Sequence, residues 1–237
     1  MRDTSWKETI ARYSLKSFLI AVVAISLSGS AWAGTLSYLV TIDTSTINGA
    51  SGNLDLQFNP GALPGTQLAT ATVQGFTSDG TLGTAVLAGD VTGALPATLS
   101  FDNQAAFNDD FQAITFGNAI QFDLVLSGPA ALAPDGVSTS GSSFGVGLWD
   151  STGFNPLLTS DPNGFAAIVN INLDGSGTPT TVPTDAGAPS VVTIMPEVTS
   201  PVPEPDTILL LGTGLAGMIG IVRRKLRVSI SEMCNLS

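Results

Sequence analysis

The sequence lacks histidine altogether and confines its eight lysine and arginine residues to its two ends. No Lys or Arg lies between Ser17 and Val222, and the single cysteine, Cys234, follows that stretch. The central part therefore has no residues for a Ser-His-Asp triad, a Cys-His pair, a Schiff-base lysine or a zinc site of the usual His and Cys type. It also has no disulfide to stabilise it.

Charge in the central part has one sign. Of the 19 acidic residues, Asp3, Glu8 and Glu232 lie in the ends, which leaves 16 between residues 34 and 222. Contacts with nucleic acid depend on Lys or Arg facing the phosphates. The composition therefore excludes nucleic acid as a partner.

The N-terminal segment has the three regions of a secretory signal peptide. Four basic residues precede an apolar run over residues 18–27, and Ala31-Trp32-Ala33 then supplies small residues just before Gly34. This order predicts a signal peptide over residues 1–33, handled by the general secretion machinery and cut by signal peptidase near Gly34. The alternative is an uncleaved membrane anchor, for which the apolar run is short.

A second apolar run covers residues 207–222 and is followed by a basic cluster, Arg223, Arg224, Lys225 and Arg227. As a helix it would span roughly 24 Å, slightly less than a hydrocarbon core of about 30 Å, and the long basic side chains can reach the headgroups. We expect a single transmembrane helix with residues 34–206 outside and a basic cytoplasmic tail over residues 223–237.

Between these ends the pattern is that of short strands. Apolar and polar residues alternate, as in Phe122, Leu124 and Leu126, and turn dipeptides such as Asn48-Gly49 and Asp79-Gly80 separate the runs. The expected strands cover residues 36–42, 54–58, 68–76, 97–101, 111–116, 120–126, 144–149, 165–173 and 191–195. This predicts an all-β ectodomain over residues 34–196, an antiparallel β-sandwich or jelly-roll-like fold. Residues 103–110 are the best candidate for a helix, of two turns at most, and residues 197–206 should form an extended stalk.

The tail resembles a PEP-CTERM sorting domain. That motif combines Pro-Glu-Pro, a Leu/Gly-rich membrane helix and an Arg-rich cluster, which here are Val202-Pro203-Glu204-Pro205, residues 207–222 and residues 223–227. Much of residues 35–196 also resembles a recurring type of PEP-CTERM exported protein without assigned activity. The two prolines suit a cleavage site because they hold the backbone extended and outside the helix.

The resemblance implies a specific route for the protein. Such tails are read by an exosortase, a membrane-embedded transpeptidase-like enzyme of Gram-negative bacteria that make exopolysaccharide. The protein would be anchored transiently in the inner membrane, cut near residues 203–205, and passed to the cell surface or extracellular matrix, where biofilm material is found. Residues 228–237 depart from the pattern, because such proteins usually end soon after the basic cluster, and they leave Cys234 as an inert thiol or an acylation site.

A glycine-rich stretch in the tail has two interpretations. Residues 212–217 match G-x-G-x-x-G, but they lie inside the apolar run and not between a strand and a soluble helix, so nucleotide binding is rejected. Gly212, Ala216 and Gly220 would share one helix face and allow close packing against another membrane helix. The alternative is that glycine is simply common in such spans.

Two acidic features are candidates for chemistry in the ectodomain. Oxygen-bearing side chains gather at Asp102, Asn103, Asn108, Asp109 and Asp110, a set that a hard cation such as calcium could use. The alternative is a solvated acidic loop, because the spacing is not that of an EF-hand. A pair of carboxylates could also serve glycoside hydrolysis, although any two of the acids would satisfy that pattern.

Aromatic residues near residue 149 are candidates for sugar stacking. Trp149 with Phe144 and Phe154 could form such a group, and core packing is the alternative. We therefore expect a noncatalytic exported surface or matrix protein, sorted by an exosortase and associated with exopolysaccharide, without a cofactor. The alternative is a calcium-dependent carbohydrate-binding module on the same fold.

Overall fold

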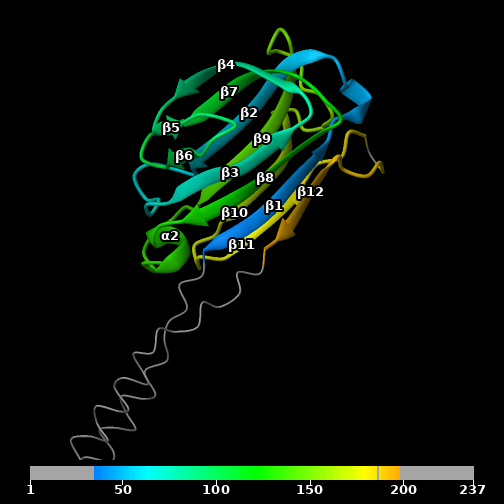
Figure 1. Ribbon diagram of the computed structural model, residues 1–237. Helices are drawn as coiled ribbons and strands as arrows, with labels where there is room; N and C mark the ends of the chain where they lie inside the picture. The colour runs from blue at the N-terminus through cyan, green and yellow to red at the C-terminus, as the bar shows by residue number, and fades with distance from the viewer. Residues whose placement is uncertain (1–34, 186, 198–237) are drawn as a thin grey trace, which may run out of the picture. The chain divides into compact units, whose positions relative to one another are not determined.

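The computed structural model describes residues 35–185 and 187–197, which fold into two six-stranded antiparallel sheets packed face to face (Figure 1). The predicted all-β sandwich is thus confirmed. Sheet A has the order β12 (Val192–Pro196), β1 (Leu36–Asp43), β8 (Ala119–Ser127), β3 (Thr70–Ser78), β6 (Leu99–Asp102) and β5 (Val91–Gly93). Sheet B has the order β11 (Gly177–Thr181), β10 (Phe165–Ile171), β9 (Ser142–Asp150), β2 (Ser51–Pro60), β7 (Asp109–Thr115) and β4 (Thr81–Ala88).

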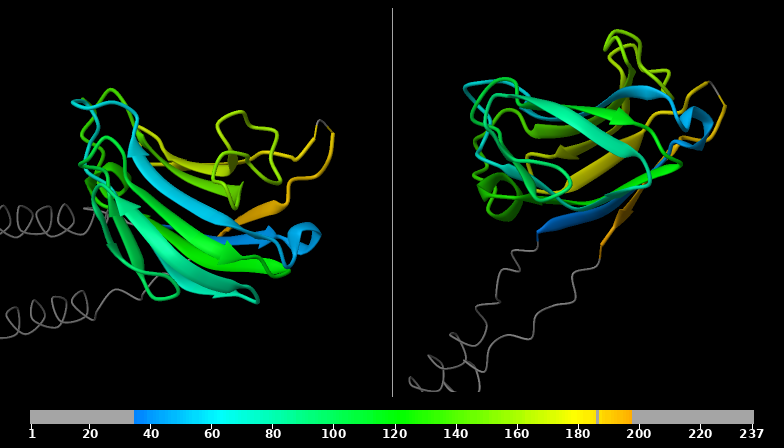
Figure 2. Two further views of the ribbon diagram at one scale, coloured as in Figure 1. Left: turned by 90° about the horizontal axis from the view of Figure 1, so that it is seen from above. Right: turned by 45° about the horizontal axis from the view of Figure 1, so that its top comes forward.

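Figure 2 shows the two sheets facing each other. Buried and exposed residues alternate along the strands, so one side of each sheet contributes apolar side chains to the core. On β8 the buried positions are Ile120, Phe122, Leu124 and Leu126, and the intervening residues face outward. β1 pairs with β8 in a register that places Val40 opposite Phe122, so the apolar faces of the two strands coincide. A period of two thus fixes which side of each strand is buried.

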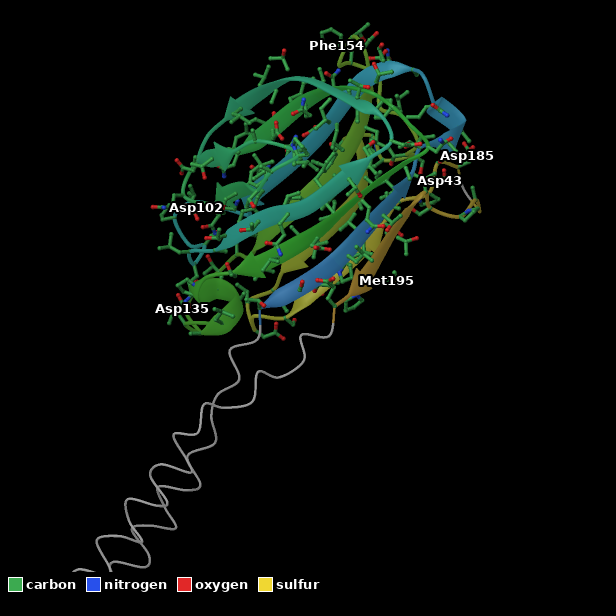
Figure 3. All side chains as sticks on the ribbon, in the orientation of Figure 1. Asp43, Asp102, Asp135, Phe154, Asp185 and Met195 are labelled. Atoms are coloured by element: carbon green, nitrogen blue, oxygen red, sulfur yellow. The ribbon has the colours of Figure 1, made fainter. Side chains whose placement is uncertain are left out.

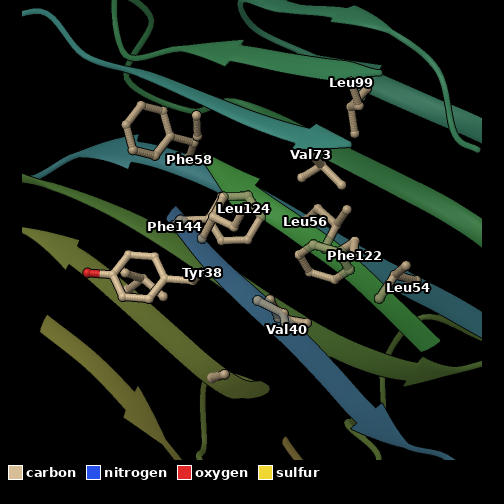
Figure 4. Packing of buried hydrophobic residues seen from close by; sticks show 14 of the residues in the cluster. Tyr38, Val40, Leu54, Leu56, Phe58, Val73, Leu99, Phe122, Leu124 and Phe144 are labelled. Atoms are coloured by element: carbon tan, nitrogen blue, oxygen red, sulfur yellow. The ribbon is translucent and has the colours of Figure 1, made fainter. Parts of the chain in front are cut away.

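Aromatic rings fill the middle of the core, which Figure 4 shows from close by. Phe144 on β9 meets Phe101 and Phe122 of sheet A edge to face, with ring centroids 6.0 and 6.4 Å apart. Leu54, Leu56 and Phe58 of β2 are fully buried beside them. Such ring contacts add to the burial of apolar area, so the core needs no disulfide for stability.

The segment before β7 is a loop held by a buried asparagine, so residues 103–110, the best candidate for a short helix, form none. Asn108 donates from Nδ2 to the carbonyl oxygens of Phe58 and Ala105, at 2.8 and 3.0 Å, and its Oδ1 accepts from the Asp90 backbone N–H at 2.8 Å. A side chain that bonds neighbouring backbone competes with helix formation. Among the described residues the helical turns are instead η1 (Ser45–Ile47) and α2 (Pro129–Leu132).

The ends of the domain lie side by side. β1 and β12 are antiparallel neighbours with Tyr38 opposite Pro196, and the Glu197 backbone N–H donates to the Ser37 carbonyl oxygen at 2.8 Å. Contacts within the chain divide it into one compact unit that ends at Glu197 and a second from Val198 to Ser237. In the described ranges no helix is long and apolar enough to cross a membrane, and the expected helix over residues 207–222 lies outside them.

Candidate functional site

The most unusual feature of the domain is a buried acidic side chain on the outer face of sheet B. Asp55 faces away from the core because it alternates with Leu54 and Leu56, yet it is only 3% exposed. Its Oδ2 accepts from Trp149 Nε1 at 3.0 Å and from Gln57 Nε2 at 3.1 Å. A carboxylate in such a place needs donors, and the neighbouring strands supply two.

Two glycines of β9 make room for the aromatic rings that cover this face. A Cβ on Gly147 would lie 2.9 Å from Trp149 Nε1, and a Cβ on Gly145 would lie 2.5 Å from the ring of Phe165. Gly164, which precedes β10 and lies beside Gly147, adopts a φ of +87° and has no room for a Cβ beside the Trp149 ring. The indole therefore packs against backbone that carries no side chains, and its N–H donates to Asp55.

Asp109 and Asp110 complete the acidic cluster from β7, and we call Asp55, Asp109 and Asp110 the acid cluster from here on. Gln57 pairs with Asp109 and Leu56 with Asp110, so Asp109 shares the outer face with Asp55 while Asp110 points into the core. Asp110 is fully buried. The carboxyl oxygens Asp55 Oδ1, Asp109 Oδ1 and both oxygens of Asp110 are buried without a hydrogen-bond donor.

The environment of the acid cluster favours protonated carboxyl groups. Burial, followed by a hydrogen bond and charge repulsion from Asp55, raises the pKa of Asp109 to about 8. Burial, with repulsion from Asp55, raises the pKa of Asp110 to about 6. Both shifts follow from removing a carboxylate from water without a compensating cation.

Chemically, the acid cluster can hold and share protons, but at least one oxygen of each of its carboxyl groups is closed to solvent. Asp55 and Asp109 are the two carboxyl groups on one face that glycoside hydrolysis would require, yet their Oδ1 atoms are both buried. An open depression of about 330 Å³ lies elsewhere on sheet B, bordered by Asn53, Leu82, Gly83 and Ser151, and no acidic side chain lines it.

The structure does not bring the candidate calcium ligands together. Asp102 is exposed and accepts from Thr70 Oγ1 at 2.7 Å, Asn103 and Asn108 bond to backbone, and Asp109 and Asp110 point to opposite faces of β7. Within the described ranges no group of three or more acidic, Cys or His side chains is arranged to hold a metal ion. We therefore identify none of these residues as a metal ligand.

The candidate aromatic group is also dispersed. Phe144 is fully buried in the core, Trp149 covers Asp55, and Phe154 is 85% exposed on the loop that follows β9 (Figure 3). The core alternative is thus correct for Phe144. Sequence reasoning missed Asp55 and its contact with Trp149, although the alternation Gly145-x-Gly147-x-Trp149 was a visible sign that a ring could lie flat on β9.

These features define a small β-sandwich domain with a tightly built, acidic interior. Beyond it, residues 201–225 match the family model of the PEP-CTERM protein-sorting motif, as the resemblance of the tail indicated. The chain therefore carries a PEP-CTERM protein-sorting motif, and this motif indicates export and recognition by an exosortase at the membrane. Comparison with curated proteins and with solved structures finds no match. The sorting residues, the basic cluster and the signal-peptide site at Ala31, Ala33 and Gly34 lie outside the described residues.

Proposed function

We propose that the domain is a noncatalytic surface or matrix module that an exosortase releases from its membrane anchor. The observation that carries this proposal is the position of the sorting motif. The matched region begins at residue 201, so three residues separate it from Glu197, the last described residue, whose backbone N–H bonds to Ser37 of the domain. The sorting signal thus follows the sandwich closely in the sequence, and we propose that the sandwich is what the signal delivers.

The noncatalytic part of the proposal is supported by how the polar side chains are used. The domain sequence has no His, Lys or Cys, and many of its acids bond to their own turns, as Asp43 does to Ser45 and Asp135 to Ser138. The two acids whose pKa is raised most, Asp109 and Asp110, each have at least one carboxyl oxygen that is buried. General acid–base catalysis requires such groups within reach of a substrate.

The destination outside the cell is supported by the sorting motif and by surface charge. A domain without a positive side chain is repelled by nucleic acid and by anionic lipid, so it should not adhere to the membrane once released. We propose that it then associates with the extracellular polysaccharide. Purified residues 34–197 should sediment with the polysaccharide of the producing bacterium, and equal recovery in the supernatant with and without polysaccharide would contradict this.

Processing can be tested by changing the motif. Replacing Pro203 and Glu204 together by Ala should leave a membrane-retained precursor of full length, because the extended backbone at the cleavage site and its carboxylate are lost. The measurement is an immunoblot of membrane and released fractions. The matched control replaces Asp185 and Pro189 by Ala, which removes one acid and one proline from an exposed loop of the domain. Normal release of the motif variant would overturn the proposal.

A further inference from the structure

The acid cluster buries more carboxyl groups than its surroundings can neutralise. Asp55 is 3% exposed and Asp110 is fully buried. Four carboxyl oxygens of the cluster have no donor. Leaving a buried carboxylate unpaired is strongly unfavourable, and such a group takes up a proton instead.

No basic residue lies in residues 35–197, so no cation of the domain can neutralise the cluster, and the acid Asp90 lies near its β7 end, where its backbone N–H donates to Asn108. β9 contributes only the neutral Trp149 N–H, and β4 has no titratable residue. β6, the strand of the opposite sheet with Leu99 and Phe101 in the core, carries only Asp102, which is exposed and bonded to Thr70. Asp55 and Asp109 therefore lie together on the outer face of sheet B and Asp110 lies on its inner face, and none of the three has a cationic partner.

We propose that Asp55, Asp109 and Asp110 form a proton-dependent lock between β2 and β7, tight while the cluster holds protons and loosened when it ionises. A protonated Asp109 can donate a hydrogen bond to Asp55 across the outer face. Once Asp109 is ionised it is repelled by Asp55, and water must enter beneath Trp149 to solvate it. The lock is independent of sorting and of the polysaccharide proposal.

The direction of the pH effect follows from linkage. Because the pKa values of Asp109 and Asp110 lie above the ordinary aspartate value in the folded state, the folded domain binds more protons than the unfolded chain. Their contribution to stability is therefore complete below about pH 4 and is lost as the pH rises through about 6 and 8. Stability should fall across this window, which is the reverse of the usual behaviour of a paired carboxylate.

The composition removes the side chains that usually titrate between pH 5 and pH 9. Residues 34–197 contain no His, Cys or Lys, and burial raises the pKa of Tyr38 above its ordinary value of 10.0. Asp109 and Asp110 are the groups of the domain whose raised pKa values, about 8 and about 6, lie between pH 5 and pH 9. Trp149 is also the only tryptophan after residue 33, so its fluorescence reports on the contact with Asp55.

The experiment uses residues 34–197, which contain every strand and the entire core of the described fold and so form a self-contained folding unit. Trp149 emission and Tm are measured from pH 4.5 to 9. We expect a red shift of the emission with a midpoint between pH 6 and 8, and a fall in Tm of about 5–10 °C between pH 5 and pH 9. A Tm that is constant or rises over this range would overturn the proposal.

Variants identify the responsible groups. Asp109→Asn and Asp110→Asn should reduce the fall in Tm between pH 5 and pH 9 by at least half, and Asp110→Leu serves if the buried amide prevents folding. Asp123→Asn is the matched control, because burial also raises the pKa of this carboxyl but it lies on β8 of the other sheet. It should leave the emission midpoint unchanged. The same midpoint and the same fall in Tm in wild type, Asp109→Asn and Asp110→Leu would also overturn the proposal.

Discussion

At the scale of single residues, the aspartates of this domain behave in two opposite ways. In the turns, Asp43 and Asp174 accept hydrogen bonds from the hydroxyl groups of Ser45 and Ser176, which lower the pKa of each carboxyl. In the acid cluster, burial raises the pKa of Asp109 and Asp110. The turn aspartates lose their contribution as the pH falls below their ordinary range, and the buried pair loses its contribution as the pH rises. The domain should therefore be most stable in mildly acidic solution.

The packing of the Trp149 indole requires a glycine at residue 164. Gly164→Ala should destabilise the domain by about 2–4 kcal/mol, because the new Cβ must displace the Trp149 ring and the backbone at φ +87° disfavours a side chain. Unfolding in urea gives the free energy, and the emission of Trp149 shows whether the ring has moved.

The control for this substitution is Gly49→Ala. Gly49 has nearly the same φ, +81°, but nothing lies within 4 Å of its Cβ position. Gly49→Ala should lower the free energy of unfolding by about 1 kcal/mol, because only the positive φ of the backbone opposes the new side chain. Equal losses in the two variants would mean that the packing of Trp149 contributes nothing at this site.

At the scale of elements, the central strands and the edge strand β12 could be predicted from the sequence, whereas the edge strands β4, β5 and β11 could not. β8 and β1 are half-buried, so their apolar residues alternate clearly. β4 is an exposed edge strand, and Gly83 lies in a bulge between Leu82 and Ala85, so its pattern is broken. β11 carries Pro179, which is tolerated at an edge but reads as a linker in a sequence.

The acid cluster, too, could be predicted from the sequence only in part. Asp109 and Asp110 were visible as neighbouring acids, but their opposite faces follow only once residues 109–115 are known to be a strand. The contact of Asp55 with Trp149 depends on the register of β2 with β9, which joins residues 94 positions apart. No local pattern encodes such a register, because it is set by the packing of the two sheets.

β4 is the edge strand with the least protection against pairing with another strand. β11 and β12 contain prolines and β5 has three residues, whereas β4 has eight residues with no charge or proline and exposes Val86 and Leu87. Val86→Lys should reduce aggregation on heating several-fold, because a charge on an edge opposes pairing. It should change stability by no more than about 0.5 kcal/mol, since the residue is 64% exposed.

Light scattering after heating measures this effect. Met195→Lys is the matched control, since it adds the same charge at a half-exposed position of β12, next to Pro196. Equal suppression by both variants would indicate that net charge, and not the β4 edge, controls the aggregation.

At the scale of the whole molecule, the folded domain carries negative charge only. Five of the 19 acidic residues, Asp3, Glu8, Glu204, Asp206 and Glu232, lie outside residues 35–197, which leaves 14 in the domain with no basic side chain. The basic residues belong to the two ends of the chain, and the C-terminal ones adjoin or lie within the matched sorting motif at residues 201–225. Positive charge is thus confined to the two ends of the chain, and residues 35–197 contain no basic side chain with which an acid could form an ion pair.

Because every charged side chain of the domain is acidic, the effect of salt on its stability tests how strongly these charges repel one another. Most proteins contain ion pairs that salt weakens, but here screening can only reduce repulsion between acids. Raising NaCl from 20 to 500 mM should therefore stabilise residues 34–197, by about 1 kcal/mol at pH 7, and Tm should rise steadily with ionic strength. KCl at equal ionic strength should give the same curve, because screening does not distinguish the two cations. A fall in Tm with salt, or an effect specific to one cation, would show that something other than uniform repulsion controls the stability of the domain.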